Sequence, residues 1–194
     1  TFKEGLPNLY CGVITNILAF LFLTCKQVKL RDKLCSVFLL LFFNVSFIIR
    51  QLDYIWHGFH FTNMIPYRFS FLYSFVVLYM AYRAWLMRHK FTPVHMMVAG
   101  GLSLLIMACS DQAKEPVFLA YNLSFLTIYL GVMIYGSFRK VLPEDANEEM
   151  VAQEVKAVHS RRNIAKIIFL VVVLVEMIVN LVCFGLAFTG TTVS

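Results

Sequence analysis

Residues 56–71 bring imidazole, amide and guanidinium side chains together in one short stretch of an otherwise apolar chain. Arg68 has the most specific chemistry, because its guanidinium stays charged and its planar fork fits phosphate oxygens at two points. His57, His60 and Asn63 could add hydrogen bonds to a phosphate or a sugar. The stretch therefore predicts a site for a phosphorylated ligand. The alternative is that Arg68 pairs only with lipid headgroups.

The two histidines also raise the question of a metal. They are three residues apart and would share a helix face, as a pair of zinc ligands does. No third ligand is apparent near them, and the chain has no glycine-rich phosphate loop. We therefore expect neither a metal nor a cofactor.

Aromatic side chains accompany these polar groups, and Trp56 and Tyr67 lie beside them in the sequence. Aromatic rings near the end of a membrane span serve first as interfacial anchors, which is the simplest interpretation of Trp56. The alternative interpretation is that both rings contact the ligand held by Arg68.

Glu176 is the second unusual group, because it lies inside the last apolar run with Asn180 one turn further along. An isolated carboxylate in hydrocarbon is costly, so it must be protonated, paired, or turned toward a watery cavity. One interpretation is a hydrogen bond to Asn180 or to another helix. The other is that Glu176 and Asn180 line the same ligand cavity as Arg68.

The chain that positions these groups is strongly apolar. Its 194 residues are 60% hydrophobic and 14% charged, against about 25% charged in an average soluble domain. Because a span needs about 20 mainly apolar residues, we predict an all-α, polytopic transmembrane helical bundle with about six transmembrane helices, at residues 8–25, 34–50, 68–87, 93–109, 117–137 and 165–188. Within this bundle, Gly100, Gly101 and Gly131 are expected to let helices approach closely.

The basic residues orient these spans. The net charge is +6, and 13 of the 17 lysines and arginines lie in or beside the first, third and fifth loops. The positive-inside rule places those loops in the cytoplasm, so both ends of the chain and the 51–68 loop face outward. Because the basic residues sit between apolar runs, we expect the lipid bilayer as a partner and no nucleic acid.

We interpret residues 1–194 as a single transmembrane domain, and as a fragment of a longer protein because the chain has neither an initiator methionine nor a signal pattern. The fifth loop, residues 138–164, is expected to be a cytoplasmic connector within this domain. It contains a helix-compatible stretch at residues 150–159. Asp145 or Asn147 would cap that helix, with acids in its first turn.

Three sequence elements together go beyond this topology. They are residues 6–12 (LPNLYCG), the run from WHGFH to YRFSF within residues 55–71, and the pair Glu176 and Asn180. In this order they resemble the bacterial YfhO family of polytopic membrane proteins over almost the whole chain. One departure is the sequence TNMI at residues 62–65, where family members often have Pro-Asn-Gly-Phe. Asn63 is retained, but the turn around it would differ.

The resemblance implies a lipid-dependent sugar transferase of the GT-C type in the bacterial cell membrane. Such an enzyme moves a hexose from a polyprenyl-phosphate carrier on the outer face to an envelope glycopolymer, lipoteichoic acid being a typical acceptor. Arg68 would then hold the carrier phosphate while the leaving group develops charge. The family's catalytic acid would lie in an outer loop upstream of this fragment, so the fragment alone is expected to be inactive.

A transporter or flippase of a lipid-linked glycan is the alternative, because it needs the same outer phosphate contact without a catalytic acid. A carboxylate in the upstream outer loop would favour catalysis, and its absence would favour transport. A purely structural scaffold is the third interpretation, in which replacing Arg68 would harm folding and activity alike.

Overall fold

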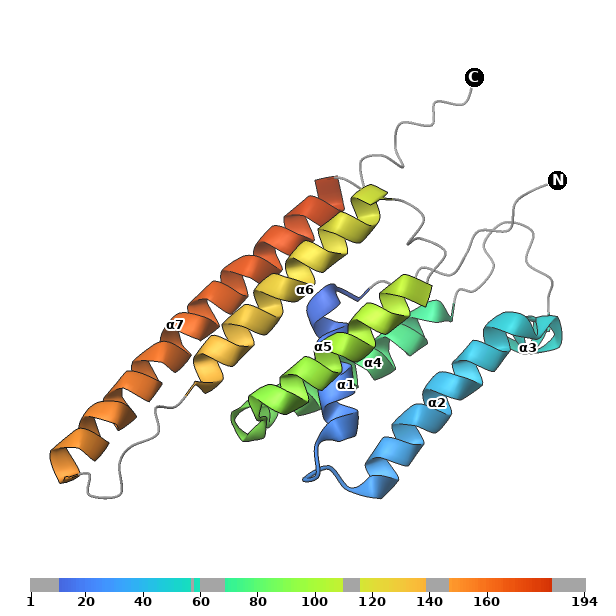
Figure 1. The fold of residues 1–194 in the computed structure, drawn as a ribbon. Coiled ribbons are helices and arrows are strands. Elements are labelled where there is room, and N and C mark those ends of the chain that lie inside the picture. The colour runs from blue at the N-terminus through green and yellow to red at the C-terminus, as the bar shows by residue number, and fades with distance from the viewer. Residues whose placement is uncertain (1–10, 57, 60–68, 110–115, 139–146, 183–194) are drawn as a thin grey trace. The chain divides into compact units, whose positions relative to one another are not determined.

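The computed structural model describes residues 11–56, 58–59, 69–109, 116–138 and 147–182 (Figure 1). Over these ranges the chain is all-α, with no strand, which confirms the predicted fold class. The elements, in chain order, are α1 (Val13–Thr24), α2 (Leu30–Ile48), α3 (Arg50–Trp56), α4 (Ser70–Leu86), the 3₁₀ turn η1 (Arg88–Lys90), α5 (Pro93–Cys109), α6 (Pro116–Ser137) and α7 (Glu148–Asn180).

Each of the six predicted apolar stretches overlaps one of the longer helices, although α2 begins four residues and α7 seventeen residues before the predicted start. Two helices, α6 over Leu119–Ser137 and α7, are long and apolar enough to cross a membrane, while α1 and α5 are shorter apolar helices. The sequence analysis missed α3, whose seven residues are too few for a span. That all six stretches cross the bilayer stays a prediction.

The chain forms two compact units. The first unit comprises residues 1–11 and 18–88, and the second unit comprises residues 12–17 and 89–194. Their boundary falls within α1, so the first turn of that helix belongs to the second unit. The single transmembrane domain over residues 1–194 stays a prediction.

In the first unit, α2 contacts both α3 and α4. The backbone of Ile49 is extended, with φ −91° and ψ 108°, and this one residue ends α2 before α3 begins. Near the start of α2, Asp32 approaches the guanidinium of Arg83 on α4 at 3.6 Å. Arg83 also donates a hydrogen bond to the Tyr79 hydroxyl one turn earlier, at 2.7 Å. These contacts join one end of the α2–α4 pair.

In the second unit, α6 lies against both α5 and α7, and α6 and α7 run side by side in opposite directions (Figure 1). The 33 residues of α7 give a length of about 50 Å at 1.5 Å per residue, whereas the hydrocarbon core of a bilayer is about 30 Å thick. The predicted helix at residues 150–159 and the predicted sixth span are therefore parts of one helix that exceeds a single crossing.

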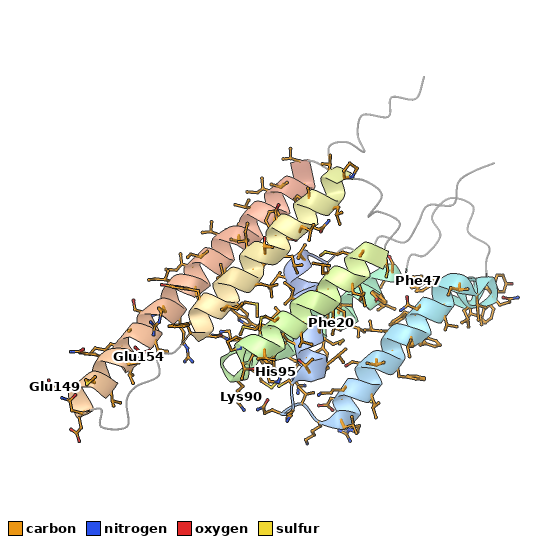
Figure 2. The ribbon with its side chains drawn as sticks, in the orientation of Figure 1. Phe20, Phe47, Lys90, His95, Glu149 and Glu154 are labelled. Atoms are coloured by element: carbon orange, nitrogen blue, oxygen red, sulfur yellow. The ribbon has the colours of Figure 1, made fainter. Side chains whose placement is uncertain are left out.

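The start of α7 follows from its sequence. The Asn147 side chain accepts a hydrogen bond from the backbone N–H of Met150 at 3.1 Å, and Glu148 and Glu149 occupy the first turn. This confirms the predicted capping by Asn147, which satisfies a backbone donor that the helix itself leaves unpaired. Asp145 lies outside the described residues. Further along, Glu154 (Figure 2) accepts a hydrogen bond from Arg161 at 2.6 Å, two turns away.

Glycine allows close helix approach at two positions in the second unit. A methyl group added to Gly100 would lie 2.5 Å from Leu130 on α6, and one added to Gly136 would lie 3.0 Å from the Cβ of Ala165 on α7. The expectation for Gly100 is therefore confirmed, while Gly101 and Gly131 have open space among the described residues, so the expectation for those two was wrong. The sequence analysis missed Gly136.

Replacing Gly136 by alanine should destabilise the protein, because the new methyl group would lie 3.0 Å from the Cβ of Ala165, which cannot rotate away, so α6 and α7 must shift by a few tenths of an ångström. Overpacking of this kind costs roughly 1–3 kcal/mol. Gly131→Ala in the same helix is the matched control, and it should be neutral or stabilising because alanine has the higher helix propensity. Thermal unfolding of both variants in detergent micelles measures the difference. Equal melting temperatures would show that Gly136 and Ala165 are not in close contact.

Candidate functional site

An aromatic stack in the first unit involves the described residues on either side of positions 60–68 in the sequence. Trp56 is the last residue of α3 and Phe69 directly precedes α4. Their rings are nearly parallel, 18° apart, with centroids 5.2 Å from each other. Phe47 on α2 stacks on the same Phe69 ring at 5.0 Å and 11°. Phe69 is only 4% exposed, whereas Trp56 is 39% exposed.

This stack joins three elements around one buried ring. Phe43 on α2 extends it, with its centroid 5.9 Å from that of Trp56. Offset or stacked aromatic pairs contribute about 0.5–1.5 kcal/mol beyond the area they bury. Trp56 and Phe69 therefore hold the end of α3 close to the start of α4. These are the described elements on either side of residues 60–68.

The end of α3 explains one part of the WHGFH sequence. The Phe59 N–H donates to the Tyr54 carbonyl at 3.0 Å and the Gly58 N–H donates to the Ile55 carbonyl at 3.1 Å, which is the hydrogen-bond pattern of a Schellman motif. Gly58 has φ 66°, which glycine adopts without steric cost. The Phe59 and Tyr54 rings meet edge to face at 5.8 Å, which is the apolar contact that often accompanies this motif.

Most of the predicted ligand residues lie outside the described residues. These are His57, His60, Asn63, Tyr67 and Arg68, and their roles stay predictions. Trp56 is described, and its ring is packed against Phe69 with part of its surface open. The structure therefore gives Trp56 a packing role, and a contact between Trp56 and the substrate stays a prediction.

Glu176 is the best-defined polar group in the second unit. It is 3% exposed. Its Oε1 accepts a hydrogen bond from the backbone N–H of Val13 at 2.8 Å, and its Oε2 accepts one from the Tyr129 hydroxyl at 2.6 Å. Tyr129 is itself fully buried. Of the two interpretations of Glu176, the structure supports hydrogen bonds to other helices.

Asn180 extends the same network along α7. Its side-chain amide donates to the Tyr121 hydroxyl at 2.8 Å and to the Glu176 backbone carbonyl at 3.2 Å. The Tyr121 hydroxyl in turn donates to that carbonyl at 3.2 Å. Phe125 lies between the two tyrosines of α6, with ring centroids 4.8 Å from Tyr121 and 6.3 Å from Tyr129. The polar face of α7 thus meets one aromatic face of α6.

The sequence analysis did not select Tyr121, Tyr129 or Val13. The i, i+4, i+8 spacing of Tyr121, Phe125 and Tyr129 was a signal for one helix face, but it does not say which helix that face meets. A cavity shared by Glu176 and Arg68 stays a prediction, because Arg68 is outside the described residues. Among the described residues no group of three histidine, cysteine or acidic side chains could hold a metal ion.

A family model described as "Bacterial membrane protein YfhO" matches residues 1–189 of the chain. The chain belongs to the YfhO family. No curated protein and no solved structure matches it. As a YfhO protein it is a bacterial membrane protein, and the many exposed apolar side chains on α7 and the other described helices fit a lipid environment.

The structure relates two of the three sequence elements that resemble YfhO proteins. The first element ends at Gly12, and a methyl group added there would lie 3.6 Å from Glu176 Oε1, in the third element. The next residue, Val13, donates directly to the same carboxylate oxygen. In this YfhO chain the start of α1 and the buried acid of α7 therefore form one structural feature, although they are separated by more than 160 positions in the sequence.

Proposed function

We propose that this chain is part of a GT-C-type glycosyltransferase. The enzyme would transfer a hexose from a polyprenyl-phosphate carrier to a cell-envelope glycopolymer, such as lipoteichoic acid, on the outer face of the membrane. The observation that carries the proposal is the YfhO family match over residues 1–189. The chemistry of Arg68 within the outer loop supports it, because a guanidinium can bind the carrier phosphate at two points.

The proposed topology places the reaction on the outer face. Six helices would cross the membrane, with the 51–68 loop and both ends of the chain outside and the connector at residues 138–164 in the cytoplasm. Tyr67 and Arg68 then end the outer loop in the sequence, just before α4, and His57, His60 and Asn63 come earlier in the same loop. The Trp56–Phe69 stack supports this arrangement, since it holds the end of α3 beside the start of α4.

Within the site, the roles follow from charge. Arg68 would bind the phosphate of the donor lipid, and its charge would stabilise the phosphate as it leaves the sugar. His57, His60 and Asn63 would donate hydrogen bonds to the phosphate or to the sugar hydroxyls. The catalytic acid or base would come from an outer loop upstream of this chain.

The test begins with mass spectrometry of envelope glycopolymers from cells that lack the gene and from cells complemented with the wild-type gene. We expect a hexose modification to disappear in the first strain and to return in the second. Identical glycopolymers in both strains would contradict the proposal for the polymers surveyed.

A second assay separates transfer from transport. Purified full-length protein in vesicles is supplied with a polyprenyl-phosphate-linked hexose and an acceptor polymer. A transferase produces glycosylated acceptor in this mixture. A transporter or flippase of a lipid-linked glycan moves the donor across the bilayer and leaves the acceptor unmodified, and that result would replace the proposed reaction by transport.

A further inference from the structure

The buried carboxylate of Glu176 meets the first turn of a different helix. Its Oε1 lies 2.8 Å from the Val13 nitrogen, and Val13 is the first residue of α1. The first four N–H groups of a helix have no partner within that helix. In hydrocarbon no water is available to satisfy them, so another part of the protein must do so.

The start of α1 lacks two usual local partners, an acidic residue in the first turn and a capping side chain at the residue before the helix. Its first turn contains no acidic residue, and Gly12 immediately before it has no side chain that could act as a cap. Gly12 has φ +90°, a conformation that other residues rarely adopt. Glu176 of α7 thus caps α1 from another helix by accepting from its first N–H, whereas an aspartate or serine N-cap accepts from the second or third N–H of its own helix.

The acid is held on its other side by α6. The Tyr129 hydroxyl donates to Oε2 at 2.6 Å, and the Tyr121 hydroxyl donates to the Glu176 backbone carbonyl. Two tyrosines on one helix therefore orient Glu176, and its remaining oxygen points to α1. The direction of the carboxylate, and with it the place where α1 begins, depends on this three-helix arrangement.

We propose that Glu176 is a positioning residue that caps α1 from α7, with Tyr129 as its orienting partner, and that it does not bind substrate. It acts through the start of α1, which follows directly on the LPNLYCG element at residues 6–12. The effect on sugar transfer rests on the function proposed above, but the effect on the position of α1 does not.

Cys11 offers a native reporter for this cap, because it lies two residues before Val13 and is partly exposed. The experiment uses full-length protein in nanodiscs in which Cys11 is the only cysteine, and it measures the rate of maleimide labelling. The variants are Glu176→Leu, Glu176→Gln and Tyr129→Phe, with Met177→Leu as the matched control because Met177 is an exposed neighbour on α7. A second set with only Cys35, which is exposed on α2, reports unfolding of the whole protein.

We expect Glu176→Leu to raise the labelling rate of Cys11 about tenfold or more, because it leaves the Val13 N–H and the Tyr129 hydroxyl without their partner. Glu176→Gln should stay near the wild-type rate, since the amide can accept from Val13 and donate to Tyr129. Tyr129→Phe should be intermediate. Met177→Leu and all Cys35 rates should remain unchanged.

Unchanged Cys11 labelling in Glu176→Leu, or an equal rise at Cys35, would overturn the proposal. Sugar transfer in the same variants gives the second criterion. Retention of transfer by Glu176→Gln and its loss in Glu176→Leu support a positioning role. Loss of transfer in Glu176→Gln with normal labelling would show that the acid itself is needed at the substrate. If the wild-type protein transfers no sugar, the proposed function fails while the labelling result still decides the role of Glu176.

Discussion

Replacing Phe69 by alanine is expected to destabilise the protein by about 3–5 kcal/mol, the usual cost of removing a buried phenylalanine. The ring is 4% exposed and lies between Trp56 and Phe47, with which it stacks at 5.2 Å and 5.0 Å. Its loss would leave a cavity where α2, α3 and the start of α4 meet. Thermal unfolding of the full-length protein in detergent micelles measures the effect.

Phe71→Ala is the matched control for this prediction, because Phe71 lies two residues further along and is 66% exposed. That variant should unfold close to the wild-type temperature. Phe69→Leu should be intermediate, since leucine fills much of the volume but cannot stack. The chain has only two tryptophans, so a Trp85→Phe background lets the fluorescence of Trp56 report on the stack directly. Equal destabilisation by Phe69→Ala and Phe71→Ala would contradict the packing described above.

Replacing Arg68 by lysine is expected to reduce hexose transfer at least about tenfold, because a charge-assisted hydrogen bond contributes roughly 1.5–3 kcal/mol. Lysine keeps the positive charge but loses the planar fork that binds a phosphate at two points. Arg68→Ala should abolish the modification. The measurement is the hexose content of envelope glycopolymers in complemented cells, normalised to the amount of inserted protein.

A control variant and two alternative outcomes test whether the loss of transfer is specific to the guanidinium of Arg68. Arg31→Lys is the control, since Arg31 is largely exposed near the start of α2 and should be replaceable without loss of transfer. An arginine that only pairs with lipid headgroups would also be replaceable by lysine, so wild-type transfer by Arg68→Lys would exclude a two-point phosphate contact. Loss of insertion together with activity would favour the scaffold interpretation instead.

Several features of the fold could be predicted from local sequence because their causes are local. Apolar runs must form helices where no water can satisfy the backbone, and each of the six predicted stretches overlaps a helix. Asn147 could be recognised as a cap from its position before two acids. The Schellman ending at Gly58 had a comparable signal in the glycine itself, although the sequence analysis did not predict α3.

The sequence alone determined that this is an all-α membrane protein of the YfhO family, because hydropathy depends on residue type. It also determined that Glu176 needs a partner, because the cost of burying a charge depends on residue type as well. Only the tertiary structure decided that the partners are Val13 and Tyr129, that Phe69 is the ring beneath Trp56, and that Gly136 rather than Gly131 meets a neighbouring helix. The physical reason is that a hydrogen bond, a ring stack or a close approach depends on which helix faces meet. Helix faces are set by packing between segments far apart in the chain, and no local pattern contains that information.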